Sequence, residues 1–359
     1  MLEMINQVEP NISNEDIQTV SEYMASGSWI TEHKVTKKLE QNIAEYVNRK
    51  YSIAVPNGTI AIYLALIASG ISEGHKVAVP NITMIATINA IIWAGATPVI
   101  IDIDNSLCIS KESLEKVSDI DAVIFVPLNG RTGLGVEIQD YCQNNNITLI
   151  EDSAHALGSS YLNQKCGSLG DISIFSFTPH KIITMGQGGM ILLDDDDVYK
   201  KLIDLKTFNR EKDKSDVHKG FGLNFKITDL QASLGLSQFN NLQQFVELKQ
   251  NLFKKYSKYI DNKYLKPFED FETPWFIDLF CDSEKQREDL NLYLASKNIE
   301  TRYSYPSLSS QSYLKETKKT DLNISEKISN NILWLPSSTN LSNDEIKYVS
   351  DEVNNFFSN

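Results

Sequence analysis

Residues that bind transition metals or form disulfides are scarce in this sequence. Only four cysteines and five histidines occur among its 359 residues. The cysteines are far apart and form no C-x-x-C pair, standing at Cys108, Cys142, Cys166 and Cys281. Such spacing matches neither a zinc site nor a dense disulfide framework. The acidic run at residues 194–197 is interpreted as a solvated turn before a helix. We therefore expect no metal site, and buried free thiols in a reducing compartment.

Positive charge is also in deficit, and long apolar runs are missing. The formal net charge is −13, whereas nucleic acids and anionic membranes select clustered lysine and arginine. The longest apolar stretch, residues 86–101, is interrupted by polar residues, glycine and proline, so it predicts no membrane span. The first ten residues lack the pattern of a secretory signal. We expect a cytoplasmic protein with neither nucleic acid nor membrane as a partner.

Short apolar segments alternate with helical patterns from residue 51 onward. Seven segments predict strands, at residues 51–55, 76–80, 97–104, 121–128, 147–152, 171–177 and 190–193. This alternation predicts an α/β fold with a mostly parallel seven-stranded sheet flanked by helices. From about residue 247 the chain is richer in lysine and tyrosine. We predict an N-terminal arm and large domain over residues 1–246, and a smaller α+β domain over residues 247–359.

Polar turns follow three of the predicted strands. They read PNGT at residues 56–59, NGR at residues 129–131 and EDSAH at residues 151–155. Ligands of parallel sheets bind beyond the carboxyl ends of the strands. The three turns therefore indicate one candidate site at that edge of the sheet.

Asp152 and Lys181 form the most informative pair of residues near that edge. Taken alone, the aspartate could be a turn former or a metal ligand, and the lysine could be exposed at a turn. Together they meet the needs of pyridoxal phosphate (PLP) chemistry. A lysine amine forms a Schiff base with PLP, and a carboxylate pairs with the pyridine nitrogen. Asn57, Gly58 and Thr59 open an apolar helix, where backbone N–H groups suit a phosphate.

Long, ordered motifs carry a family resemblance over nearly the whole chain. They include SGSWIT, PNGTIAIYLAL, IEDSAHALGSSY, GSLGDISIFSFTPHKIITMGQGG and GFGLNFKITDLQASLGLSQF. With these motifs the chain closely resembles the DegT/StrS family of sugar aminotransferases, which have PLP fold type I. The resemblance implies PLP as the cofactor, pyridoxamine phosphate as an intermediate form, and a homodimer with shared active sites.

The resemblance also implies roles for individual residues. Lys181 would be the Schiff-base lysine, and Asp152 would pair with the pyridine nitrogen. The other residues implied at the cofactor are His155 near the ring hydroxyl, Met84 at the ring face, Gly58, Thr59 and Ser176 at the phosphate, and Asn224 reaching the phosphate from a neighbouring subunit. Trp29, Thr31, Arg302 and Tyr303 are candidate sugar-nucleotide contacts, for which packing or surface roles are equally open.

The implied reaction is transamination of a nucleotide-linked ketosugar, with L-glutamate as the amino donor. The segment KIITMGQGGM resembles members that aminate C4 of a 4-keto-6-deoxy sugar in glycan or O-antigen biosynthesis. The alternatives are C3 amination, a PLP-dependent sugar dehydratase, and a non-catalytic PLP or sugar-nucleotide sensor. A dehydratase of this family has histidine in place of the Schiff-base lysine, whereas Lys181 is intact here. A sensor would be expected to lose either the lysine or the aspartate, and both are present.

Overall fold

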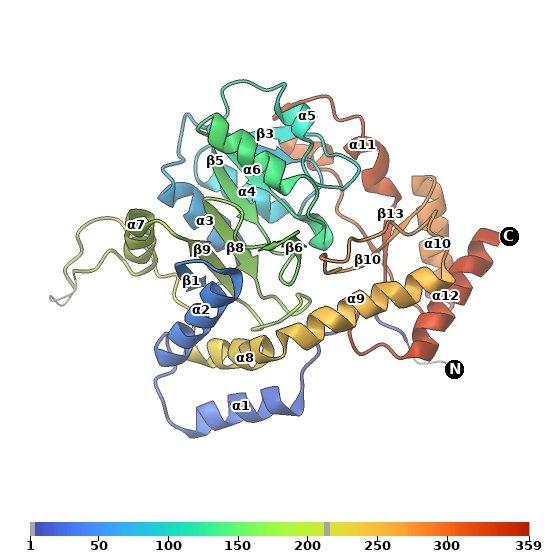
Figure 1. The fold of residues 1–359 in the computed structure, drawn as a ribbon, viewed down its shortest axis with the longest axis horizontal. Helices are drawn as coiled ribbons and strands as arrows, with labels where there is room; N and C mark the ends of the chain where they lie inside the picture. Colours follow the sequence, from blue (N-terminus) through green and yellow to red (C-terminus); the bar gives the residue numbers. More distant parts are fainter. Residues whose placement is uncertain (1–3, 212–215, 359) are drawn as a thin grey trace.

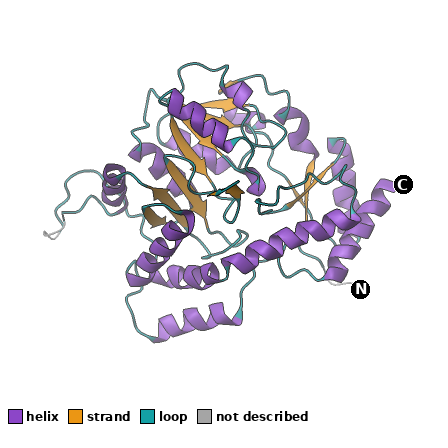
Figure 2. Ribbon diagram, viewed as in Figure 1, coloured by secondary structure: helices purple, strands orange, loops and turns teal. Residues whose placement is uncertain are grey.

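The computed structural model describes residues 4–211 and 216–358 and has an α/β architecture. Its centre is an eight-stranded sheet that is covered by helices on both faces (Figures 1 and 2). In spatial order the strands are β1 (Tyr51–Val55), β9 (Gly189–Leu193), β8 (Ile172–Ser176), β5 (Thr148–Asp152), β4 (Ala122–Phe125), β2 (Lys76–Pro80), β3 (Thr97–Ile101) and β12 (Lys318–Lys319).

The strand directions confirm the prediction of a mostly parallel sheet. Only β9 runs against its neighbours, β1 and β8, and every other pairing in this sheet is parallel. The seven predicted strands are all present. The eighth, β12, adds to the β3 edge from the C-terminal part of the chain. It was not predicted because its two lysines lie in a polar segment without apolar alternation.

Helices cover both faces of the sheet and bury its apolar residues in the core of this part of the chain, with a larger cluster on one face and a smaller one on the other. They are α2 (Lys34–Val47), α3 (Gly58–Ala68), α4 (Ile85–Trp93), α5 (Lys111–Leu114), α6 (Gly135–Asn144), α7 (Asp196–Lys206) and α8 (Asp229–Asn240). The helix α3 is apolar on all sides because it contacts β8 and β9 as well as α4 and α7. The acidic run begins as the expected turn, in which Asp195 caps α7 by accepting from the backbone N–H groups of Asp197 and Val198. Its second half differs from the expectation, because Asp196 and Asp197 already belong to the first turn of α7. All four cysteines are free and buried.

The C-terminal part contains a second core around a three-stranded sheet. Its elements are α9 (Leu242–Tyr259), β10 (Ile277–Phe280), α10 (Glu284–Ser296), β11 (Arg302–Tyr303), α11 (Ser325–Ile328), β13 (Ile332–Leu335) and α12 (Asn343–Ser358). The proposed domain boundary at residues 246/247 falls inside α9, which runs unbroken from α8 to the C-terminal part (Figure 1). The N-terminal arm also joins this part, because Ile5 is buried in the second core and bridges to Ile299. The helix α1 (Asn14–Ala25) follows that arm and contacts α8.

No helix in residues 4–211 and 216–358 is both long and apolar enough to cross a bilayer.

Candidate active site

A cavity of about 300 Å³ opens at the carboxyl ends of β1, β2, β5 and β8. Nine of the residues singled out from the sequence line it: Asn57, Gly58, Thr59, Met84, Asp152, His155, Ser176, Lys181 and Arg302. The chain reaches this edge repeatedly because each parallel strand ends there before its crossover. The PNGT and EDSAH turns therefore meet in space, as their positions in the sequence indicated. The NGR turn does not line the cavity.

The turn between β1 and α3 forms the cavity's best anion site. The side chain of Asn57 accepts from the N–H of Ile60 at 3.0 Å and so caps α3. The backbone N–H groups of Gly58 and Thr59 lie in the first helical turn, where no carbonyl of the helix can accept from them. Ser176, the last residue of β8, lies so close that a Cβ at Gly58 would be 3.0 Å from the serine Cβ. A phosphate fits this place because N–H groups, a hydroxyl and the helix dipole all favour an anion.

Replacing Gly189 with alanine is expected to displace the phosphate turn. A Cβ at Gly189 would lie 2.6 Å from the carbonyl carbon of Asn57, and such a clash requires the backbone to move. We expect PLP affinity, measured by fluorescence titration, to fall at least about tenfold. If each contact to the phosphate is weakened by about 1 kcal/mol, the losses of binding free energy add up to more than the ~1.4 kcal/mol that corresponds to a factor of ten. Gly70→Ala is the matched control: Gly70 has φ +85° and open space around it, so it should lose about 1 kcal/mol of stability and keep its PLP affinity.

Asp152 ends β5 and is buried in the floor of the cavity. Its carboxylate accepts from the hydroxyl of Thr87 at 2.8 Å and from the N–H of Ala154 at 3.3 Å. Burial raises the pKa of Asp152, while these two hydrogen bonds and the charge of Lys181 oppose the rise. A buried carboxylate of this kind gains stability from a cationic ring nitrogen, as the role implied by the sequence requires.

Lys181 lies in the loop after β8, with its amine inside the cavity. Burial lowers the pKa of Lys181 to about 7, and the positive charge of Arg302 acts in the same direction. The negative charge of Asp152 opposes both effects. A lysine amine that is neutral near pH 7 is a competent nucleophile and proton acceptor.

His155 stands beside the lysine with one nitrogen unpaired. Its Nδ1 is buried and has no hydrogen-bond partner in the part of the chain that the structure describes, and its Nε2 lies 3.4 Å from the hydroxyl of Tyr305. The ring stacks on Trp275 with a centroid distance of 4.1 Å. Burial lowers the pKa of His155 well below its usual range, so the ring is neutral at pH 7. An unpaired nitrogen of a neutral ring is suited to a hydrogen bond with a bound ligand.

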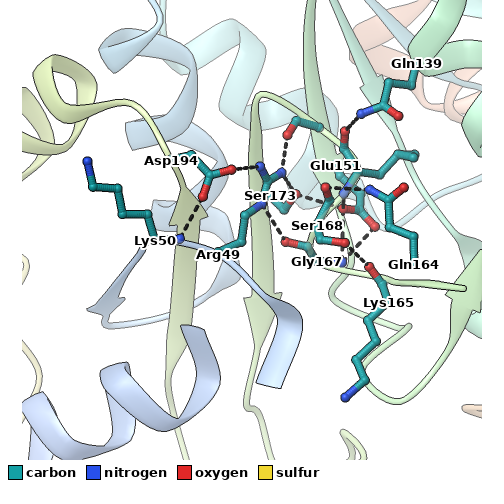
Figure 3. A network of polar contacts seen from close by, with 12 residues as sticks. Arg49, Lys50, Gln139, Glu151, Gln164, Lys165, Gly167, Ser168, Ser173 and Asp194 are labelled. Carbon is teal, nitrogen blue, oxygen red and sulfur yellow. Dashed lines mark hydrogen bonds and ion pairs between the residues drawn. The ribbon is translucent and has the colours of Figure 1, made fainter. Parts of the chain in front are cut away.

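Glu151, the neighbour of Asp152, points to the opposite face of β5 and is fully buried. Its carboxylate accepts from the N–H groups of Gly167 and Leu169 and from the hydroxyl of Ser173, all within 2.8–3.0 Å. Figure 3 shows how these contacts join β5 to β8 and to the loop that follows β7 (Gln164–Lys165). The network fixes the end of the strand that carries Asp152.

Four of the residues named from the sequence lie outside the cavity. Trp29, Thr31 and Asn224 are exposed, on loops that are tied to neighbouring segments by the bridges Thr31–Thr228 and Thr207–Asn224. Tyr303 points away from the cavity and stacks on the guanidinium of Arg287 at 4.1 Å. Successive residues of β11 face opposite sides, so Arg302 reaches the cavity and Tyr303 does not.

The sequence reasoning missed several further residues at the site, and three of them make the contacts described here. Thr87 and Tyr305 line the cavity, and the fully buried Trp275 contacts both His155 and Lys181. Thr87 could have been found by helical spacing, because it lies three residues after Met84. Tyr305 could not be singled out, because the alternation of an extended strand would place it on the same side as Tyr303. No local pattern in the sequence indicates that Trp275 lies at the site.

Comparisons with known proteins identify the family. The model of the DegT/DnrJ/EryC1/StrS aminotransferase family matches residues 10–354. The chain belongs to this family. It is 33% identical to the GDP-perosamine synthase of Escherichia coli O157:H7, over 98% of each chain. It is 30% identical to the dTDP-3-amino-3,6-dideoxy-alpha-D-galactopyranose transaminase of Aneurinibacillus thermoaerophilus, again over 98% of each. The solved structure of Helicobacter pylori PseC, an aminotransferase of pseudoaminic acid biosynthesis, matches with a TM-score of 0.93 and 23% identity, covering 99% of this chain and 100% of that one.

The cofactor of this DegT-family sugar aminotransferase is therefore PLP. Three features of the cavity fit PLP. They are the buried carboxylate of Asp152, the amine of Lys181 with its lowered pKa, and the N-terminus of α3 with small residues around it. The unpaired Nδ1 of His155 is a fourth. Because the site retains both Asp152 and Lys181, it does not support the alternative that the protein is a non-catalytic sensor.

Proposed function

We propose that the protein transfers an amino group from L-glutamate to C4 of a nucleotide-linked 4-keto-6-deoxy sugar. The observation that supports this most directly is the 33% identity, over 98% of both chains, to a GDP-perosamine synthase. The intact Lys181 in the cavity favours amino transfer over dehydration. The product would be a deoxyaminosugar for O-antigen or other glycan biosynthesis in the cytoplasm.

Bound PLP would supply an electron sink that stabilises negative charge on the substrate carbon. Lys181 would hold it covalently and, once released, would carry the proton between the substrate carbon and the cofactor. Asp152 would keep the ring nitrogen protonated, and His155 would donate to or accept from the ring hydroxyl. Asn57, Gly58, Thr59 and Ser176 would bind the phosphate, and Met84 would cover the ring. Because Lys181 would be released at the carbon to which it had been bonded, its amine would already lie beside the reacting carbon, and little entropy would oppose the proton transfer.

C3 amination is the second candidate. It is favoured by the 30% identity, over 98% of each chain, to a transaminase whose name places the amino group at C3. The difference between 33% and 30% does not discriminate between the two positions. Arg302 is exposed at the mouth of the cavity, where it suits the diphosphate of either substrate.

A homodimer with shared sites is part of the proposal. Asn224, Trp29 and Thr31 are exposed outside their own cavity, as expected of residues that would act in the site of a second copy. Lys181→Ala and Asn224→Ala chains, each mixed and refolded with the other, should regain activity, because one site of a mixed dimer would carry neither change. Mixtures that stay as inactive as the separate variants would contradict the sharing of sites.

The deciding experiment is a substrate panel. The pyridoxamine phosphate form would be mixed with GDP-, dTDP- and UDP-linked 4-keto-6-deoxy sugars and with their 3-keto isomers. Return of the PLP absorbance reports amino transfer, and NMR of the product locates the new amine. Amination at C4 is the expected result. Amination at C3 would favour the second candidate, and the absence of any reaction with glutamate would contradict the transaminase assignment.

The rate should fall on the acid side of neutrality. The pKa of Lys181 is about 7, so below this pH the released amine is protonated and cannot accept a proton. We expect kcat to show an acidic limb near pH 7, falling about tenfold for each further pH unit. The pKa of His180 is lowered to about 4 by burial, so a histidine limb would lie much lower. A limb near pH 4 in the pH profile of kcat would contradict the assignment of the base to Lys181.

A further inference from the structure

Trp275 is a buried side chain that contacts both Lys181 and His155. Its residue is fully buried. The Nζ of Lys181 lies 4.2 Å from the centroid of its ring, and the ring of His155 stacks on it with an interplanar angle of 10°. Yet Trp275 comes from the segment before β10, 94 positions after the lysine in the chain.

Three hydrogen bonds fix the position of this tryptophan. Its indole N–H donates to the carbonyl of His180 at 2.6 Å, directly beside Lys181 in sequence. Its backbone N–H donates to the carbonyl of Asn129 at 3.2 Å. Its own carbonyl accepts from the buried amine of Lys249 at 2.8 Å. Phe276 also stacks on its ring at 3.8 Å. Trp275 is therefore held by the turn after β4, by the lysine loop and by α9.

We propose that Trp275 is a positioning residue that holds the released Lys181 by a cation–π contact once its amine has become an ammonium. An ammonium within about 6 Å of an indole centroid is stabilised, and more strongly where water is excluded. After Lys181 has accepted the proton, the contact would keep the resulting ammonium beside the reacting carbon, where it can return the proton, instead of letting the flexible lysine chain turn away. This inference rests on the proposed covalent role of Lys181.

Other groups also act on this amine and have to be separated from the ring. They are Asp152, whose negative charge favours the ammonium, and Arg302, whose positive charge disfavours it. A substitution that empties space at Trp275 would admit water and alter all of these effects together. A sharp test therefore has to change the electrons of the ring and keep its shape.

Fluorinated tryptophan provides that change, because fluorine withdraws electron density from the face of the indole ring and so weakens its attraction for a cation. The protein would be produced with fluorotryptophan, brought to its pyridoxamine phosphate form, and treated with trace acetic anhydride across a range of pH. Peptide mass spectrometry gives the acetylation rate of Lys181 and hence the midpoint of its titration. We expect fluorination to lower this midpoint by roughly 0.5 pH unit, the size of a weakened cation–π contact.

The chain has three other tryptophans, Trp29, Trp93 and Trp334, and these need a control. In Trp275→Phe, fluorotryptophan should leave the midpoint unchanged, whereas in Trp29→Phe, Trp93→Phe and Trp334→Phe the shift should persist. Should Trp275→Phe not fold, the other three variants make the same assignment. A midpoint that fluorination does not lower, or lowers equally in Trp275→Phe, would overturn the inference.

The proposed function can fail separately. Borohydride reduction of the PLP form should fix the cofactor to Lys181, and a label on another lysine would overturn the proposed role of Lys181 itself. A label on Lys181 without any effect of fluorination would overturn only the role of Trp275.

Discussion

Lys181→Ala should lower turnover by roughly three to four orders of magnitude. The change removes the covalent attachment of PLP and the proton carrier at once, and each group contributes about 10² to 10⁴ in enzymes of known mechanism. The phosphate turn and Asp152 are untouched, so PLP should still bind without a covalent link. In this variant, glutamate should convert at most one equivalent of bound PLP to pyridoxamine phosphate, and only slowly. The measurement is the steady-state rate of amino transfer, together with borohydride reduction, which should no longer fix the cofactor to the protein.

Lys249 provides the control for this prediction. Burial lowers the pKa of Lys249 to about 7 as well, so a lowered pKa by itself does not mark the functional lysine. Its amine donates to the carbonyls of Trp275 and Ser337 and does not line the cavity. Lys249→Met should therefore keep the borohydride-fixed cofactor on Lys181. Full turnover by Lys181→Ala, or loss of fixation in Lys249→Met, would contradict the assignment.

The parts of the fold and site that local sequence patterns encode could be predicted. The bounds of β1 and β2 agree with the prediction, because each is a short and mostly apolar run that is bounded by turn residues. Asp152, Ser176 and the PNGT turn share a property of parallel sheets, since residues at strand ends meet at one edge. Their convergence on one cavity therefore followed from the alternation of strands and helices.

Contacts between distant segments could not be predicted in this way. The NGR turn follows β4, as the sequence indicated, but its side chains bind the segment around the start of β10 and do not line the cavity. Asn129 exchanges hydrogen bonds with the backbone of Phe276, and the buried Arg131 pairs with the buried Asp278. Each of these pairs is separated by 147 positions. A turn with asparagine, glycine and arginine normally lies in solvent, so nothing local indicated that it delivers Trp275 to the site.

Glu151→Gln should destabilise the protein by about 3 kcal/mol or more, the largest effect on stability expected from a change of so few atoms. The carboxylate accepts hydrogen bonds at both oxygens. Oε1 accepts from the hydroxyls of Ser153 and Tyr161 and from the N–H of Gly167, and Oε2 accepts from Ser173 and from two backbone N–H groups. An amide carries donors on one side. In the place of Oε2 its NH₂ group would face the backbone N–H groups of Gly167 and Leu169, which can only donate. In the place of Oε1 it would face the N–H of Gly167, and the hydroxyls of Ser153 and Tyr161 would have to rotate and accept.

The shape of the side chain is unchanged in Glu151→Gln, so the loss would measure the buried hydrogen bonds and not a cavity. Ser153→Ala removes only one donor to the same carboxylate and should cost about 1 kcal/mol. Urea unfolding of both variants in the PLP form gives the comparison. Equal losses of stability in the two variants would show that the backbone donors find other partners, and that Glu151 does not hold the end of β5 to β8. A markedly larger loss for Glu151→Gln is expected, because the backbone N–H groups of Gly167 and Leu169 are buried there and have no water to turn to.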